Sequence, residues 1–321
     1  MDTQKHLFDN KKMAVLLIPL AIDQLLNSFM GTVDTLVVSS LGSAAISAVT
    51  LVDSINILIV QAFFALASGG TVVCSHYLGC KKQDHAKEAA RQLIFITFCL
   101  SVLIAVICLL FNGQILGLIF GEVEESVMAN AKQYFFFSAI SYPFIALYDD
   151  GSCILRAQEN SSLPMKISIC SNIVNAVLNI WFVWGLHFGV AGSACATMLA
   201  RLFAMFVVMY KLRKPDLEIP VYDYFTIRPQ WKEIRRILNI GIPSGIENSM
   251  FQFGKLAIQS TVSLMGTAAI AAQGMANLIE NLNGILAIGV GVGLMTVVGE
   301  SLGAGRKDEA IYYVKKLSIV S

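Results

Sequence analysis

The sequence predicts an all-α polytopic membrane protein. Of its 321 residues, 56% are hydrophobic and only 14% are charged, whereas soluble domains carry about 25% charged residues. The mean hydropathy is +0.67, and the apolar residues gather in segments of the roughly 20 residues that a helix needs to cross a bilayer. This composition excludes a soluble enzyme and a disordered protein, and the net charge of +1 gives no basic excess for a nucleic acid.

Eight apolar segments qualify as membrane spans. Several exceed the length that a bilayer requires, so we expect tilted helices or extensions into the aqueous phase. The first is not a signal peptide, because it has no small-residue cleavage pattern and runs past an apolar core of about 7–15 residues. A ninth apolar stretch begins just before Ser321. The eight spans lie at residues 13–41, 44–77, 90–112, 128–155, 164–186, 190–212, 237–264 and 267–300.

The basic residues predict the orientation of the spans. Every lysine and arginine except Lys132, Arg201 and Lys255 falls at the N-terminus or at the inner ends of spans that alternate across the membrane. Cytoplasmic segments carry an excess of these residues. We therefore expect the N-terminus and the loops 79–92 and 211–236 to be cytoplasmic, with the chain in the cell inner (plasma) membrane.

The chain contains an internal repeat at an offset of 224 residues. The repeat makes spans seven and eight a copy of spans one and two. Glycine, proline and aspartate match by chance less often than apolar residues do, and they match here in the pairs Pro19 and Pro243, Gly42 and Gly266, Gly69 and Gly293, Gly79 and Gly303, and Asp84 and Asp308.

The two copies start six spans apart, an even number, so both begin on the same side of the membrane. This parallel relation occurs in secondary transporters. We expect a two-lobe helix bundle in which residues 1–213 form the N-terminal six-helix lobe, residues 214–233 the cytoplasmic linker, and residues 234–321 a partial C-terminal lobe with helices 7, 8 and the start of 9. About four spans of the second copy are then absent, and we expect the chain alone not to transport.

Several motifs fall at these spans. Residues 30–35 read Met-Gly-Thr-Val-Asp-Thr, residues 175–179 read Asn-Ala-Val-Leu-Asn, and residues 189–194 read Gly-Val-Ala-Gly-Ser-Ala. With Tyr77-Leu78-Gly79 and Gly241-Ile242-Pro243, they resemble the multidrug and toxic compound extrusion (MATE) family over the whole chain. The resemblance implies a MATE-like two-lobe bundle around a central cavity, truncated after the eighth transmembrane helix. It also implies efflux of organic, often cationic, compounds in exchange for H⁺ or Na⁺.

Polar side chains recur at one depth in the N-terminal lobe. A helix rises about 1.5 Å per residue, which puts Asp34, Asp53, Asn179 and Thr197 about 10–13 Å below the outer face, and Asn175 about 16 Å below it. An acid inside a membrane is costly and marks a functional site by default. Oxygen ligands suit a hard cation, so we expect these five residues to bind the coupling cation or a proton.

Each of these residues also has a structural interpretation. Asp34 matches the essential acid of the family, but a protonated and hydrogen-bonded carboxyl is the alternative. The two asparagines can serve as interhelical hydrogen-bond donors, and Thr197 can bond its own backbone. For Asp53 the structural and functional interpretations are equal. Several family members have an acid where this chain has Asn179, so the resemblance implies a site that prefers a proton or binds Na⁺ weakly.

The partial second lobe carries its own charged residues. Lys255 and Glu280 fall near mid-membrane, where an ammonium needs a partner. A structural ion pair between them is favoured over a role in coupling. Four further acids are expected to be local hinge or solvent-facing groups: Asp23, Glu247, Asp149 and Asp150.

Other kinds of site and partner are not indicated. The seven cysteines show no metal-ligand spacing, so we expect no metal, although transient Na⁺ fits, and no cofactor. No catalytic motif indicates an enzyme. The expected partners are small-molecule substrates and the lipid bilayer, with no nucleic acid and a monomeric full-length protein. A lipid-linked precursor flippase is the alternative function, but it would need cationic residues in the cavity, where Asp34 and Asp53 instead favour a cation.

The topology is testable by cysteine labelling. Asp84→Cys on a cysteine-free background should react with a membrane-impermeant thiol reagent only after the membrane is opened, because the 79–92 loop is expected to be cytoplasmic. Labelling of this residue from outside intact cells would contradict the orientation.

Overall fold

The computed structural model describes residues 7–120, 124–222, 224, 228–263, 284 and 287–320, and helices account for all of their regular structure. The π-helical turn Trp181–Gly185 directly continues α6. In chain order the helices are α1 (Asn10–Ser39), α2 (Ser43–Gly79), α3 (Gln83–Leu110), α4 (Asn112–Phe120), α5 (Glu125–Ala157), α6 (Ser162–Ile180), α7 (Gly189–Leu212), α8 (Trp231–Ser263), the helix Ala287–Gly303 and α10 (Lys307–Val320).

The predicted spans correspond to these helices, with differences at the ends. Helices α3 and α8 begin six or more residues before the predicted spans, because backbone hydrogen bonding continues through polar turns that hydropathy does not detect. The short helix α4 was not predicted. Four helices in the described part of the chain are long and apolar enough to cross a membrane, namely α2, α3, α6 with its π-helical turn, and α7. Of the predicted span 267–300, only residue 284 and residues 287–300 are described.

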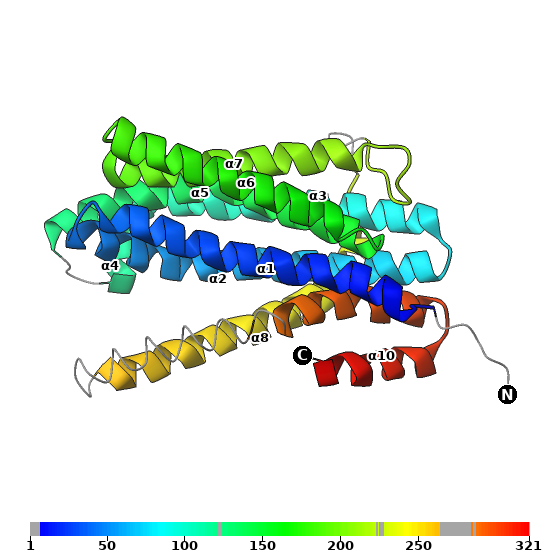
Figure 1. Cartoon of the computed structure of the whole chain (residues 1–321). Coiled ribbons are helices and arrows are strands. Elements are labelled where there is room, and N and C mark those ends of the chain that lie inside the picture. The colour runs from blue at the N-terminus through cyan, green and yellow to red at the C-terminus, as the bar shows by residue number, and fades with distance from the viewer. Residues whose placement is uncertain are drawn as a thin grey trace.

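Helices α2 and α5 form the centre of the bundle. They pack along each other, α5 also packs on α7 and α3, and α2 also packs on α8 and α3. Figure 1 shows α2, α3, α5 and α7 running side by side, with α1 lying along α6, while α8 slants away from the bundle. One core cluster contains Phe63 and Tyr142 between α2 and α5, and a second contains Leu93, Ile154 and Val208. The end of the bundle that carries Lys12, Lys82, Arg213 and Arg306 is called the basic end below.

Two repeat-related glycines bring the two repeats together at the basic end. A Cβ atom added to Gly79 of α2 would overlap the carbonyl oxygen of Glu300, and one added to Gly303 would overlap the carbonyl oxygen of His76. The two contacts are related by the repeat, because Gly303 lies 224 residues after Gly79 and Glu300 lies 224 residues after His76. The Cys80 thiol also donates to the Gly303 carbonyl oxygen at 3.1 Å. We call this contact the glycine crossing.

The helix starts reinforce the glycine crossing on both sides. The Tyr77 hydroxyl donates to the Glu233 carboxylate at 2.9 Å, which ties the start of α8 to α2. At the start of the first repeat, the Leu7 amide donates to the Glu309 carboxylate of α10 at 3.1 Å, and the Phe8 amide donates to the Tyr313 hydroxyl of α10 at 2.9 Å. The start of each repeat therefore docks on the other repeat.

The glycine crossing predicts a stability effect. Gly79→Ala and Gly303→Ala should each destabilise the protein by about 1–3 kcal/mol, because the added methyl group meets a backbone oxygen that no rotamer change can move. Thermal unfolding in detergent measures this as a lower Tm. Gly117→Ala in α4 is the control, since its Cβ would enter open space and alanine favours a helix by about 1 kcal/mol. Equal Tm values for all three variants would contradict the close approach.

Candidate functional site

A cavity of about 380 Å³ lies among the helices of the first lobe. Its walls come from α1, α5, α6 and α7, with Phe64 from α2, and most of its lining side chains are polar or charged. The charged residues of the lining are Asp23, Asp34, Asp149, Arg156 and Arg201.

The predicted residues on α1 and α6 meet directly. The Asn179 side chain donates through Nδ2 to Asp34 Oδ1 at 2.8 Å, and Asn179 is fully buried. One turn along α6, Asn175 Nδ2 donates to Thr197 Oγ1 of α7 at 3.3 Å. The side-chain oxygens of both asparagines accept no hydrogen bond in the described part of the chain. The arrangement thus offers a carboxylate and two amide oxygens with unused acceptor capacity.

Thr197 also makes the bond to its own helix backbone that its structural interpretation predicted. Its hydroxyl donates to the Ser193 carbonyl oxygen at 3.2 Å while it accepts from Asn175. This hydroxyl therefore orients the Asn175 amide, so Thr197 can make its backbone bond and still take part in the site.

Asp53 lies in a neighbouring polar network between α2 and α5, outside the residues that line the cavity. Asn56 Nδ2 donates to Asp53 Oδ1 at 3.2 Å and to Ser138 Oγ at 3.3 Å, while the Tyr142 hydroxyl donates to Asn56 Oδ1 at 2.8 Å. The common depth predicted from the sequence thus brings three of the five residues, Asp34, Asn175 and Thr197, into the cavity lining, with Asn179 bonded to Asp34 behind it.

Charged residues that the sequence did not assign to the site line the same cavity. Arg201 lies one helical turn beyond Thr197 on α7, and its Nη1 donates to Ser141 Oγ at 2.7 Å. That spacing of four residues was a signal in the sequence, because it puts both side chains on one helix face. Arg156 of α5 pairs with Asp23 of α1 at 3.3 Å.

The expectation that Asp23 and Asp150 are local or solvent-facing is wrong. Asp23 is 3% exposed and Asp150 is 0% exposed, because both point into the bundle between packed helices. Asp149 also lines the cavity, whereas Glu247 is exposed. Periodicity alone did not show which helix face meets a neighbour.

The predicted pair of the second lobe stays a prediction. Lys255 Nζ lies 5.0 Å from the ring centroid of Phe251, a cation–π distance. Glu280 falls outside the described residues. A partner carboxylate for Lys255 is therefore neither shown nor contradicted.

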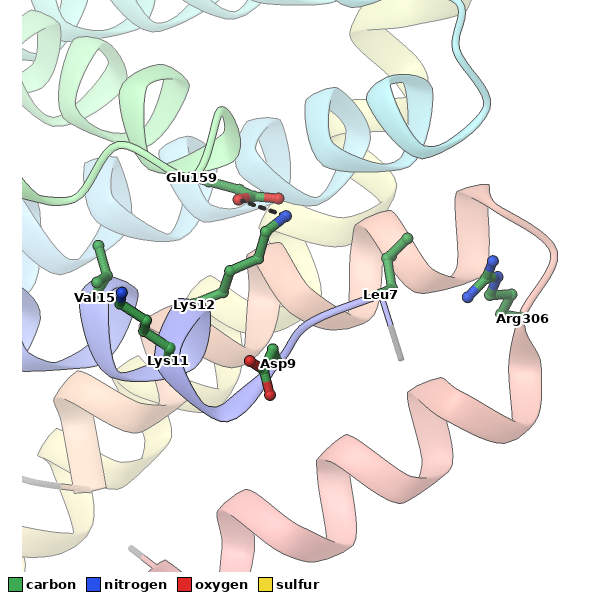
Figure 2. A pocket seen from close by; sticks show the side chains of 7 residues that line it. All are labelled: Leu7, Asp9, Lys11, Lys12, Val15, Glu159 and Arg306. Atoms are coloured by element: carbon green, nitrogen blue, oxygen red, sulfur yellow. Dashed lines mark ion pairs between the residues drawn. The ribbon is translucent and has the colours of Figure 1, made fainter. Parts of the chain in front are cut away.

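A second cavity, of about 970 Å³, opens at the basic end and is lined by exposed charges (Figure 2). Lys12 Nζ and Glu159 Oε2 pair across it at 3.7 Å, with the Lys12 side chain exposed and that of Glu159 partly exposed. No group of three or more histidine, cysteine or acidic side chains that could hold a metal ion occurs within the described ranges. This second cavity therefore has the character of a solvated surface.

Comparison with known proteins gives consistent matches over nearly the whole chain. The chain is 24% identical over 318 residues to the probable multidrug resistance protein NorM of Thermotoga maritima, covering 97% of this chain and 67% of that protein. It is 27% identical to the probable multidrug resistance protein YoeA of Bacillus subtilis, covering 93% and 65%. The chain thus spans about two thirds of the length of these relatives.

The fold has close structural neighbours. An outward-facing structure of a multidrug resistance MATE family transporter superposes with a TM-score of 0.89 at 20% identity, covering 97% of this chain and 68% of that one. The MatE family model matches residues 19–181 and 243–321, which is more than half of the chain. This chain therefore belongs to the MATE family of multi-pass membrane transporters.

Proposed function

We propose that the protein is a secondary active efflux antiporter that exports organic, cationic compounds in exchange for H⁺ or Na⁺. The observation that carries the proposal is the Asp34–Asn179 contact beside two amide oxygens that accept no hydrogen bond among the described residues. Asp34 and Asn175 line a cavity large enough for part of a small molecule. The names of the relatives as multidrug resistance proteins support the efflux function.

Competition for one negative charge explains the exchange. When Asp34 is ionised it attracts a cationic substrate, and when a proton or Na⁺ occupies it that attraction is lost. The two ligands are then linked reciprocally, so each weakens binding of the other by the same factor. Asn179 holds the carboxylate in place through its amide group. We propose that its oxygen and that of Asn175, which accept no hydrogen bond among the described residues, serve as further oxygen ligands of the cation.

The proposed orientation places the basic end in the cytoplasm of the cell inner membrane. The glycine crossing and the docked helix starts then close the cytoplasmic side. Similarity to an outward-facing family structure supports a closed cytoplasmic side. The substrate would leave from the opposite end, while the repeats separate at the basic end to admit the next substrate.

The flippase alternative has less support. Arg156 and Arg201 do supply cationic groups to the cavity, yet three carboxylates line it with them. The relatives reported above are named as multidrug resistance proteins. A lipid-linked pyrophosphate would meet an excess of negative charge in this cavity.

Asp34→Asn tests the central role of the carboxylate. The substitution keeps the volume and the hydrogen-bonding capacity but fixes the group as neutral, so folding should be normal. Efflux driven by a Na⁺ or pH gradient should fall by roughly 5–150-fold, the usual range of a coupling free energy. The measurement is substrate movement from vesicles that contain the whole transporter, with each gradient imposed separately. An unchanged rate with unchanged pH and Na⁺ dependence would make Asp34 a structural residue.

Asn179→Asp tests the identity of the coupling cation. A second carboxylate beside Asp34 should strengthen the Na⁺ dependence of efflux, because two anions hold a hard cation more tightly than one. We expect the Na⁺ concentration for half-maximal efflux to fall by about tenfold, which corresponds to about 1.4 kcal/mol. Asn172→Asp is the matched control, because Asn172 lines the same cavity on the same helix but bonds to Asn27. A larger effect in the control would contradict the assignment of the cation to Asp34.

A further inference from the structure

The cavity of the first lobe ends on a buried ion pair toward the basic end. Arg156 Nη2 lies 3.3 Å from Asp23 Oδ2, and the two residues are 7% and 3% exposed. Eleven residues separate Asp23 from Asp34 on α1, which is about 16 Å along the helix. Both carboxylates line the same cavity, so a continuous space leads from the Asp34 site to this pair.

The ion pair is only half satisfied. Asp23 Oδ1 and Arg156 Nε have no hydrogen-bond partner in the part of the chain that the structure describes. Removing two charges from water costs several kcal/mol per ion, and apolar residues of similar volume often stabilise a protein as well or better. A buried pair that keeps an open carboxylate oxygen is therefore poorly explained by stability alone.

A second carboxylate lies within reach of the same guanidinium. Asp149 and Arg156 are seven residues apart on α5, which puts them on one face two turns apart. Arginine side chains on a helix lean toward its N-terminus, where Asp149 lies, and both residues line the same cavity. Arg156 therefore has two possible partners, Asp23 and Asp149, and can neutralise only one of them at a time.

The charges of the cavity leave room for one more cation. Its lining carries three carboxylates, on Asp23, Asp34 and Asp149, and two guanidinium groups, on Arg156 and Arg201. A single monovalent cation or proton makes the sum zero. Because a net charge is costly within a membrane, the cavity is expected to hold that cation as it passes from one carboxylate to another.

We propose that Asp23 is a second, inner station for the coupling cation, which displaces Arg156 from Asp23 so that the guanidinium pairs with Asp149. The proposal rests on the antiport function proposed above and adds the path from Asp34 toward the cytoplasm. If the cation is a proton, it leaves the Asp34 carboxyl group and binds the Asp23 carboxylate, with no other change in bonding. The neutral side chains of Ser168 and Asn27, which bond to each other at 3.2 Å, lie beside this station.

The inner station is also in contact with the second repeat. Thr296 Oγ1 donates to the Arg156 carbonyl oxygen at 3.2 Å, and a Cβ atom on Gly289 would lie 3.3 Å from the Ala21 amide nitrogen. The helix Ala287–Gly303 thus touches both elements of the pair. The charged or titratable groups that face Asp23 are Arg156, Tyr148 and Asp149 of α5 and Arg201 of α7, and Thr296 is the neutral contact from the second repeat.

The test removes the charges without removing volume. Asp23→Asn combined with Arg156→Gln leaves a neutral, hydrogen-bonding pair, so the whole transporter should fold and bind substrate. Gradient-driven efflux from vesicles should fall by about tenfold or more and lose its pH or Na⁺ dependence, since coupling typically accounts for about 5–150-fold. The exposed pair offers the control, because Lys12→Gln with Glu159→Gln removes an ion pair outside the cavity path and should leave efflux unchanged.

Two further variants separate a station from a structural pair. The charge exchange Asp23→Arg with Arg156→Asp keeps an ion pair, so a structural role predicts wild-type coupling, whereas the proposal predicts a loss because α1 no longer carries the carboxylate. Asp149→Asn leaves the observed pair intact and removes only the alternative partner of Arg156. Asp149→Asn should lower gradient-driven efflux several-fold with an unchanged Tm. If the double variants do not fold, this single variant distinguishes a cation station from a structural ion pair.

The outcomes distinguish this proposal from the proposed function. If Asp34→Asn abolishes coupling while the Asp23, Arg156 and Asp149 variants couple like the wild type, the inner station is wrong and the antiport function stands. If the wild type shows no gradient-driven efflux, or Asp34→Asn has no effect on it, the proposed function fails first. Loss of coupling in both groups, with intact controls, supports the station.

Discussion

The placement of buried charges beside a partner or in a polar cavity organises the first lobe of this molecule. In a hydrocarbon environment neither water nor lipid can satisfy an ionised side chain. The first lobe meets this constraint by turning the charges of α1, α5 and α7 toward one cavity. The opposite faces of the same helices carry exposed apolar side chains such as Leu36, Phe136 and Phe206, which suit contact with lipid. The charges and the lipid-facing surface therefore fix the rotation of each helix about its own axis.

The sequence predicted the helices well and the site in part, for physical reasons. Membrane spans follow from apolar length, so most helices were found, while α4 was missed because nine residues are too few to cross a bilayer. Depth along each helix was enough to bring Asp34 and Asn179 together. Depth does not show how each helix is rotated about its own axis, however. Asp53 therefore lies in a neighbouring network with Asn56 and Tyr142 and not in the cavity.

The ion pair of Asp23 and Arg156 shows what the sequence lacked. Their residues are 133 positions apart, and nothing local to either one indicates the other. Only the packing of the helices, with α1 along α6 and α5 along α7, brings both residues to one buried cavity. The predicted partner of Lys255 poses the same problem in the second lobe, where helix rotation again decides which charges meet.

The glycine crossing has the form of an isologous contact, in which one patch meets a copy of itself across a two-fold axis. Gly79 lies on the carbonyl oxygen of Glu300 and Gly303 lies on that of His76, so each repeat supplies both a glycine and an acceptor surface. Homodimers are joined in this way, with one chain copy in place of each repeat. The junction between the repeats is therefore self-complementary, and a single lobe bearing this patch already has the surface with which to pair with its twin.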